Sequence, residues 1–152
     1  MKIPIDIKIK SERICSDLIH RGGQDLAPET DELFINGFMK KTKDGYRIEF
    51  SESDGDTTVI DTFADSTVSL NRGGPGSLHS HMVFADGKAH TCICNTDFMP
   101  IQMRVRTKSL VNSLTMQGGK LDIDYTVEII GNLAERNRLS FSISPDKSII
   151  RS

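Results

Sequence analysis

Hydrophobic and polar residues alternate with a period of two along much of this chain. In the first ten residues, isoleucines at positions 3, 5, 7 and 9 alternate with proline, aspartate and lysine. This period places successive side chains on opposite faces of a β-strand, whereas a helix repeats its face every three or four residues. The same alternation recurs over residues 46–50 and 139–143. The pattern therefore predicts strands that each bury one face.

About ten such strands are expected, joined mostly by tight turns that contain glycine. Asp86-Gly87 is the strongest of these turn signals, and Gly118-Gly119 marks another. Residues 17–30 are polar and contain Arg21-Gly22-Gly23, which predicts a loop or a short irregular helix. The expected strands cover residues 2–10, 31–41, 46–50, 56–64, 67–70, 80–84, 88–94, 101–116, 120–130 and 139–143.

The connections between these strands indicate how they pair. The chain lacks a run of helix-period residues that could link parallel strands, so neighbouring strands are expected to be antiparallel. A sheet of this many strands exposes two edges unless it closes. The pattern therefore predicts an all-β, up-and-down barrel of about 8–10 strands in a single domain over residues 1–152. A two-sheet sandwich is the alternative.

Charge and cysteine content narrow the environment and the partners. Nineteen Lys and Arg against 21 Asp and Glu give a net charge of −2, which does not favour nucleic acid or an anionic membrane as a partner. The three cysteines are an odd number in a chain long enough to fold without disulfides. No stretch approaches the roughly 20 apolar residues of a membrane span. These features predict a cytoplasmic protein with reduced thiols.

Several short motifs resemble those of a known family. They are Met82-Val83-Phe84 followed by Gly87-Lys88 and His90, Arg106-Thr107 with Leu110, Gly118-Gly119-Lys120-Leu121 with Tyr125, and Asn137 with Leu139. In order and spacing they resemble the YwiB-like family of uncharacterised bacterial proteins, over roughly residues 30 to 144. The resemblance implies a calycin- or lipocalin-like antiparallel barrel and no established activity.

A first candidate site lies on the expected inward face of residues 101–116. The hairpin at Gly118-Gly119 pairs the strand of Leu110 and Asn112 with the strand of Tyr125. In this pairing all three side chains are expected to point inward. Carrying this phase back along the strand places Arg104, Arg106 and Lys108 inward as well, unless a bulge reverses it. A basic group over an apolar floor favours binding of a small amphipathic anion. The alternative is a barrel filled by its own side chains, with the cations paired or at the rim.

A second candidate site follows from the Asp86-Gly87 hairpin. A two-residue loop would pair His81 with Cys92 and His79 with Cys94, so all four side chains would share one face. Two histidines and two cysteines at this spacing could bind zinc, the one cofactor that the sequence suggests. In the alternative interpretation these side chains are unliganded and Met82 and Phe84 face the core.

Three functions follow from these features. The first is a non-enzymatic barrel that binds a small amphipathic or anionic ligand through Arg104, Arg106, Lys108, Asn112 and Tyr125. The second is an interaction or scaffold protein with a filled barrel, acting through an exposed strand or residues 73–78. The third is an enzyme that uses a metal on His79, His81, Cys92 and Cys94. No known catalytic motif is present, so the first is preferred.

Overall fold

The computed structural model describes residues 2–15, 29–52, 55–74, 80–95, 100–129 and 133–146. All regular structure in these residues is β-strand. Of the loop predicted at residues 17–30, residues 17–28 lie outside the described residues, whereas residues 29 and 30 begin a strand. Most of the segment 73–78 also lies outside the described residues. The strands are β1 (Lys2–Cys15), β2 (Glu29–Lys41), β3 (Tyr46–Ser51), β4 (Thr57–Phe63), β5 (Thr67–Gly73), β6 (Ser80–Ala85), β7 (Ala89–Asn95), β8 (Pro100–Asn112), β9 (Gly119–Ile129) and β10 (Leu133–Pro145).

The strands form one closed barrel in up-and-down order. Each strand from β2 to β10 pairs antiparallel with the strand before it, and β10 returns to pair with β1. The closing ladder is long, running from Ile5 opposite Pro145 to Cys15 opposite Glu135. The predicted all-β antiparallel barrel is therefore confirmed, and the alternative of a two-sheet sandwich, whose sheets do not close on each other, is wrong.

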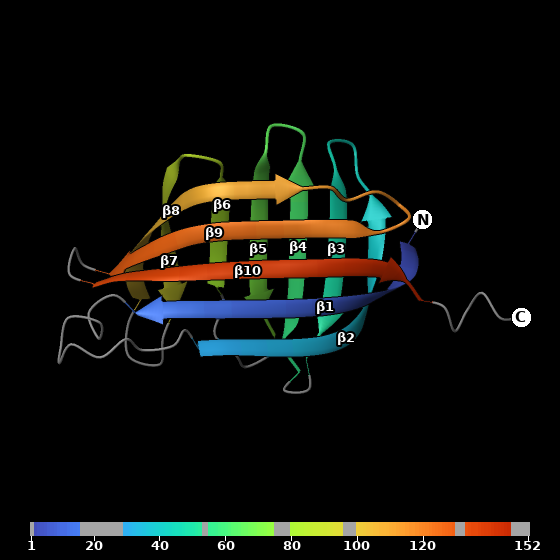
Figure 1. Ribbon diagram of the computed structural model, residues 1–152, viewed down its shortest axis with the longest axis horizontal. Coiled ribbons are helices and arrows are strands. Elements are labelled where there is room, and N and C mark those ends of the chain that lie inside the picture. Colours follow the sequence, from blue (N-terminus) through green and yellow to red (C-terminus); the bar gives the residue numbers. More distant parts are fainter. Residues whose placement is uncertain are drawn as a thin grey trace, which may run out of the picture.

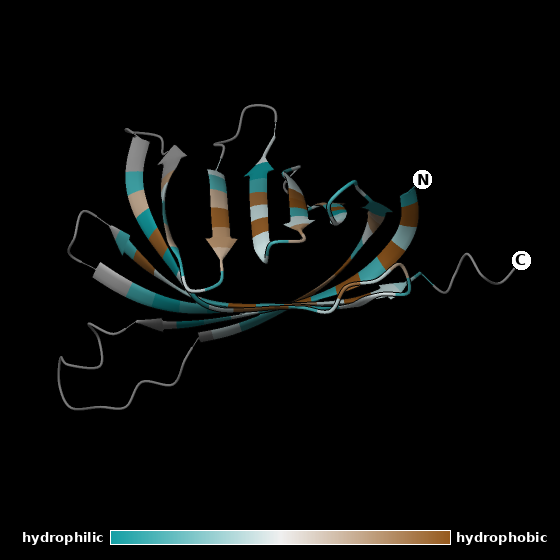
Figure 2. Cartoon of the chain, turned by 90° about the horizontal axis from the view of Figure 1, so that it is seen from above, coloured by the Kyte–Doolittle hydropathy of each residue, from teal (hydrophilic) through white to brown (hydrophobic). Residues whose placement is uncertain are grey.

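The barrel is flattened into two layers. The long strands β1, β8, β9 and β10 and the first part of β2 run across the front, and the shorter strands β3 to β7 run crosswise behind them (Figure 1). β2 bends at one end of the molecule and its second part joins the rear layer (Figure 1). Seen from above, the front layer curves around the rear one, with hydrophobic and hydrophilic stripes alternating along the strands (Figure 2).

The core lies between the two layers. It is built from alternate residues of the strands, such as Ile5 and Ile7 on β1 or Leu121 and Ile123 on β9, all nearly inaccessible to solvent. This matches the period of two seen in the sequence, because only one face of each strand turns inward. Among the described residues, the largest fully buried side chain is Phe84 on β6.

Candidate functional site

The barrel wall has a gap beside the first part of β2. That strand pairs with β1 from Glu29 to Lys40, but with β3 only from Gly37 to Lys41. Before Gly37, the other edge of β2 has no partner strand among the described residues. At Gly37 a Cβ atom would lie 2.4 Å from the carbonyl oxygen of Glu49, so only glycine fits this corner. Within the part of the chain that the structure describes, the corner leaves one end of the barrel open.

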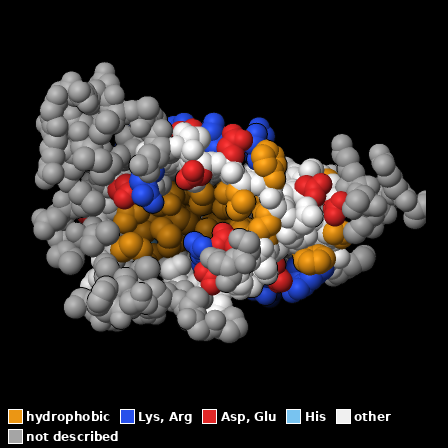
Figure 3. Space-filling view, turned by 90° about the horizontal axis from the view of Figure 1, so that it is seen from below, with side chains coloured by type: hydrophobic (Ala, Val, Ile, Leu, Met, Phe, Trp, Pro, Cys, Tyr) orange, Lys and Arg blue, Asp and Glu red, His pale blue; other side chains and the backbone are white. Residues whose placement is uncertain are grey.

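A hollow lined by hydrophobic side chains lies inside this open end. The view from below shows hydrophobic atoms deep in the hollow and charged side chains around its rim (Figure 3). Inward-facing side chains are buried in the middle of the barrel and become partly exposed toward the gap, where Leu33 is 42% exposed. Other partly exposed hydrophobic side chains with this inward phase include Ile9, Ile35, Leu70, Met82, Val127 and Leu139.

Polar inward side chains follow the hydrophobic ones toward the open end. Arg13, Asn137, Tyr125 and Thr107 lie opposite one another in a single row across four strands. Nε of Arg13 lies 2.7 Å from Oε1 of Glu135. A pocket of about 220 Å³ adjoins this row, and its lining also includes Ser11, Asp31 and Leu139. The interior therefore changes from apolar to polar over a short distance.

Tyr125 lies where the apolar and polar parts of the interior meet. Its ring packs against Phe84, with the ring centroids 4.7 Å apart. Burial raises the pKa of the Tyr125 hydroxyl to about 12; nearby Glu135 adds to this rise and Arg13 opposes it. The hydroxyl is therefore neutral at physiological pH, and it can donate or accept a hydrogen bond in the pocket.

Comparison with known proteins assigns the chain to a family. Residues 13–141 match the family described as a domain of unknown function, DUF1934. The chain belongs to this family. The match runs from the end of β1 into β10 and so includes the strands that carry the hollow and its polar row.

A solved structure shares the fold of this DUF1934 chain. The crystal structure of ywiB protein from Bacillus subtilis is similar over 93% of this chain and 92% of that chain, with a TM-score of 0.66 and 16% identity. The similarity confirms the resemblance to the YwiB-like family and is consistent with a calycin-like barrel. A search of the curated proteins finds no match. Within the described residues, no helix is long and apolar enough to cross a membrane.

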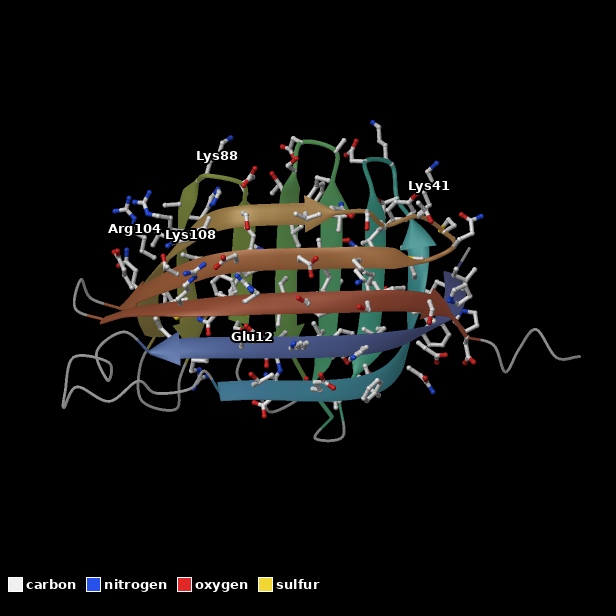
Figure 4. All side chains as sticks on the ribbon, in the orientation of Figure 1. Glu12, Lys41, Lys88, Arg104 and Lys108 are labelled. Atoms are coloured by element: carbon white, nitrogen blue, oxygen red, sulfur yellow. The ribbon has the colours of Figure 1, made fainter. Side chains whose placement is uncertain are left out.

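The predicted inward orientation of Arg104, Arg106 and Lys108 is wrong. All three side chains are exposed, while Val105 and Thr107 between them are buried. Figure 4 shows Arg104 extending away from the barrel. In this DUF1934 chain the three cations therefore lie on the outer surface. A role for them in ligand binding stays a prediction, but such a site would not be inside the barrel.

A β-bulge in β8 explains this reversal. The pairing of β8 with β9 shifts by one residue between Thr107 and Ser109, which leaves Lys108 without an opposite residue. A one-residue bulge exchanges the two faces of a strand. The sequence contains a signal for it: Val105 and Leu110 are both hydrophobic but lie an odd number of positions apart, so both face inward only across a bulge.

Asn112 and Tyr125 follow the predicted phase but occupy different surroundings. Asn112 lies opposite Leu121 at the end of β8, and its side chain is exposed. Its Oδ1 accepts a hydrogen bond from the backbone N–H of Leu114 at 3.0 Å, which stabilises the following turn. Of the five predicted ligand-binding residues, Tyr125 is the one that lines the pocket beside Arg13.

The four predicted metal ligands do not share one face. Nε2 of His81 lies 3.0 Å from Oγ of Ser69 on the exposed side of the sheet. The side chain of Cys92 is only 6% exposed and belongs to the core. The expectation that His81 and Cys92 face each other is therefore wrong. His79 and the side chain of Cys94 lie outside the described residues, so their part of the metal site stays a prediction.

A slip of one residue between β6 and β7 separates these side chains. The Asp86-Gly87 turn forms as predicted, but Ser80 pairs with Cys94 in place of His79. Thr107 of β8 binds the turn: its hydroxyl accepts a hydrogen bond from the last β6 residue at 3.2 Å, and its N–H donates to the residue after the turn at 2.9 Å. In the part of the chain that the structure describes, no group of three or more metal-binding side chains is assembled.

The sequence interpretation missed the polar end of the interior. The alternation of isoleucines at positions 3–9 continues in phase through Ser11 to Arg13. Extending the expected first strand by three residues would have placed Arg13 inward. Asn137 and Glu135 likewise share the phase of Leu139, which follows them on the inward face of β10. The signal was present, because each strand is longer than its hydrophobic part.

Proposed function

We propose that this protein binds a small amphipathic molecule in the open end of its barrel. The apolar body of the ligand would occupy the hollow, and its polar head group would lie at the row of Arg13, Tyr125 and Asn137. One observation carries this proposal: toward the gap, the inward side chains become partly exposed and change from hydrophobic to polar. Apolar pockets with a few polar groups at one end are typical of small-molecule sites.

The interior offers suitable contacts for both the apolar body and the polar head group of the ligand. Partly exposed side chains such as Val127 and Leu139 would lose contact with water, which contributes roughly 25 cal/mol per Å² of buried apolar surface. Arg13 uses its Nε for Glu135, so its remaining guanidinium N–H groups are the donors left for a head group. A head group that accepts hydrogen bonds, such as a carboxylate, fits this end.

The hollow also distinguishes this proposal from a filled barrel that acts only through its outer surface. A filled barrel would leave no hollow lined by hydrophobic side chains of the kind that Figure 3 shows. Here Phe141 is 2% exposed, whereas Leu139, two residues closer to the open end, is only partly buried. The partial exposure favours a space that a ligand can enter.

Fluorescence titration with dansyl-undecanoic acid, a carboxylate on an apolar chain, tests the proposal. We expect wild-type protein to bind this probe saturably. Val127→Asp places a charge in the hollow and should weaken binding by about tenfold or more. The bound probe would remove water from this charge, which costs free energy. Thr126→Asp is the matched control: it lies on the outer face between Arg106 and Arg136 and should bind the probe as wild type does.

The head-group contact is tested with Tyr125→Phe. Loss of the hydroxyl should weaken binding of the carboxylate probe by a few-fold, the effect of about 1 kcal/mol for one hydrogen bond. Circular dichroism should first show that each variant is folded. Equal affinity of wild type and Val127→Asp for the probe would place any binding elsewhere and contradict the proposal.

A further inference from the structure

A groove of about 620 Å³ crosses the outer face of the barrel, on the opposite side of the sheet from the interior hollow. It runs over β9, β10, β1 and β2, which lie side by side in the front layer (Figure 1). The outward side chains of β10 in this region are serines, and their small size leaves the middle of the groove low. The side chains used below are Asp6, Lys8, Phe34, Lys120 and Ser142, which all contribute to its lining.

Four of these residues form a row across the groove. Lys8 lies opposite Phe34 on one side and opposite Ser142 on the other, and Ser142 lies opposite Lys120. Adjacent strands are about 4.8 Å apart, so the two lysines start about 10 Å from each other with only the serine hydroxyl between them. Two extended lysine side chains can both reach an atom held above Ser142.

The row contains two positively charged side chains, Lys8 and Lys120, and no negatively charged one. Nζ of Lys8 lies 4.0 Å from Oε1 of exposed Glu32, a weak contact for an ion pair, and 5.7 Å from the centre of the Phe34 ring. No ion pair to Lys120 occurs among the residues that the structure describes. The neighbouring row differs, because there Lys10 lies opposite Ser140, which in turn lies opposite Asp122.

The aromatic side of the groove is open to solvent. Phe34 is 71% exposed, so the face of its ring is accessible to a ligand. Its ring lies next to Lys8, at one end of the row whose other end is Lys120, so an apolar body could pack on the ring while an anionic group reaches toward Ser142. Asp6 lies opposite Ser144 in the row on the other side and disfavours a second negative charge.

We propose that this outer groove binds a singly charged anion attached to an aromatic body. The anionic group lies between Lys8 and Lys120 and accepts a hydrogen bond from the Ser142 hydroxyl, and the aromatic body packs on Phe34. Charge complementarity and the exposed ring together select this ligand class. The site is separate from the interior hollow, so each proposal can fail without the other.

Two probes with the same head group test the site. Benzenesulfonate and methanesulfonate both carry one sulfonate charge, but only the first has a ring. In amide-detected NMR titrations at constant ionic strength, benzenesulfonate should shift the signals of Lys8, Lys120 and Ser142 saturably. Methanesulfonate should bind about five- to tenfold more weakly, as expected from one aromatic contact. Phe34→Ser should remove this difference.

Lysine variants provide the matched comparison. Lys8→Gln and Lys120→Gln should each weaken benzenesulfonate binding about five- to tenfold, whereas Lys10→Gln, on the same face and next row, should change it less than about twofold. All three substitutions are on the exposed outer face and remove the same charge. If Lys10→Gln weakens binding as much as Lys8→Gln does, the anion responds only to general surface charge and the proposal is overturned. Shifts confined to inward-facing residues would overturn it as well.

Discussion

At the scale of single residues, Asp124 on the outer face of β9 is held by cations from the next strand. Both oxygens of its carboxylate accept hydrogen bonds from Arg136, at 3.2 Å from Nε and 2.8 Å from Nη2. Arg138 lies 3.7 Å away. The hydrogen bond from Arg136 is the main reason that the pKa of Asp124 lies below its ordinary value, with Arg138 and Lys108 contributing and burial opposing.

This arrangement predicts a pH-dependent loss of stability in Asp124→Asn. A carboxyl whose pKa is lowered on folding stabilises the protein fully above its unfolded pKa of about 3.9, and this contribution is lost as the pH falls through the folded pKa. The variant should therefore lose about 1 kcal/mol near pH 7, a modest value because Arg136 is 42% exposed. In urea unfolding of both proteins, the difference should shrink as the pH falls below the unfolded pKa of about 3.9 and vanish once the pH is below the folded pKa. A difference that persists there would show that the ion pair is not its cause.

The candidate site shows what alternation alone can predict for a residue. The phase of Tyr125 was correct because β9 is unbroken around it and its ladder with β10 has no register shift. The phase of Arg104 and Arg106 was wrong because one extra residue, Lys108, separates them from the position that fixed the phase. Each face assignment therefore holds only as far as the ladder continues without a bulge.

At the scale of elements, Gly37 shapes β2 and with it the gap. Gly37→Ala would place a Cβ atom 2.4 Å from a backbone oxygen of β3 and 3.1 Å from Ile7. Backbone cannot yield as a flexible side chain does, so we expect a loss of about 2 kcal/mol or more in the free energy of unfolding. Chemical denaturation measures it.

Gly87→Ala is the control for Gly37→Ala. Gly87 has a φ of +72°, but nothing lies within 4 Å of the position of an added Cβ. Its substitution should therefore cost only the strain of the left-handed backbone, about 1–2 kcal/mol, with the pairing of β2 and β3 unchanged. If Gly37→Ala is as stable as wild type, the close approach at Glu49 does not determine the bend of β2.

The elements themselves were largely predictable, whereas their register was not. Alternation located the strands because burial of one face is a local property of the sequence. Register between β6 and β7 depends on Thr107, which binds the turn from a third strand more than ten residues later. A hairpin rule uses only the residues of the hairpin, so it placed His81 and Cys92 together when the chain places them on opposite faces.

At the scale of the whole molecule, closure of the barrel divides the interior into a packed centre and an open end. β1 pairs with β10 over most of its length, which seals the front layer, while β2 pairs with β3 only from Gly37 onward, and its unpaired first part borders the gap. Closure was predictable because a meander of ten strands otherwise exposes two edges. The gap was not, because it depends on where a strand bends rather than on which residues are hydrophobic.

This division predicts opposite effects for two neighbouring positions on β10. Phe141 is 2% exposed in the packed centre, and Phe141→Ala should lower the free energy of unfolding by about 3–5 kcal/mol. Leu139 has the same inward phase but is partly buried near the open end, so Leu139→Ala should cost about half as much or less. Urea denaturation compares the free energies of unfolding of the two variants.

Binding of dansyl-undecanoic acid should show the reverse order, with Leu139→Ala weakening it more than Phe141→Ala, because Leu139 lines the pocket. Equal stability losses with equal binding losses would mean that the interior is one uniform core, and the separation of structural centre from binding end would be wrong.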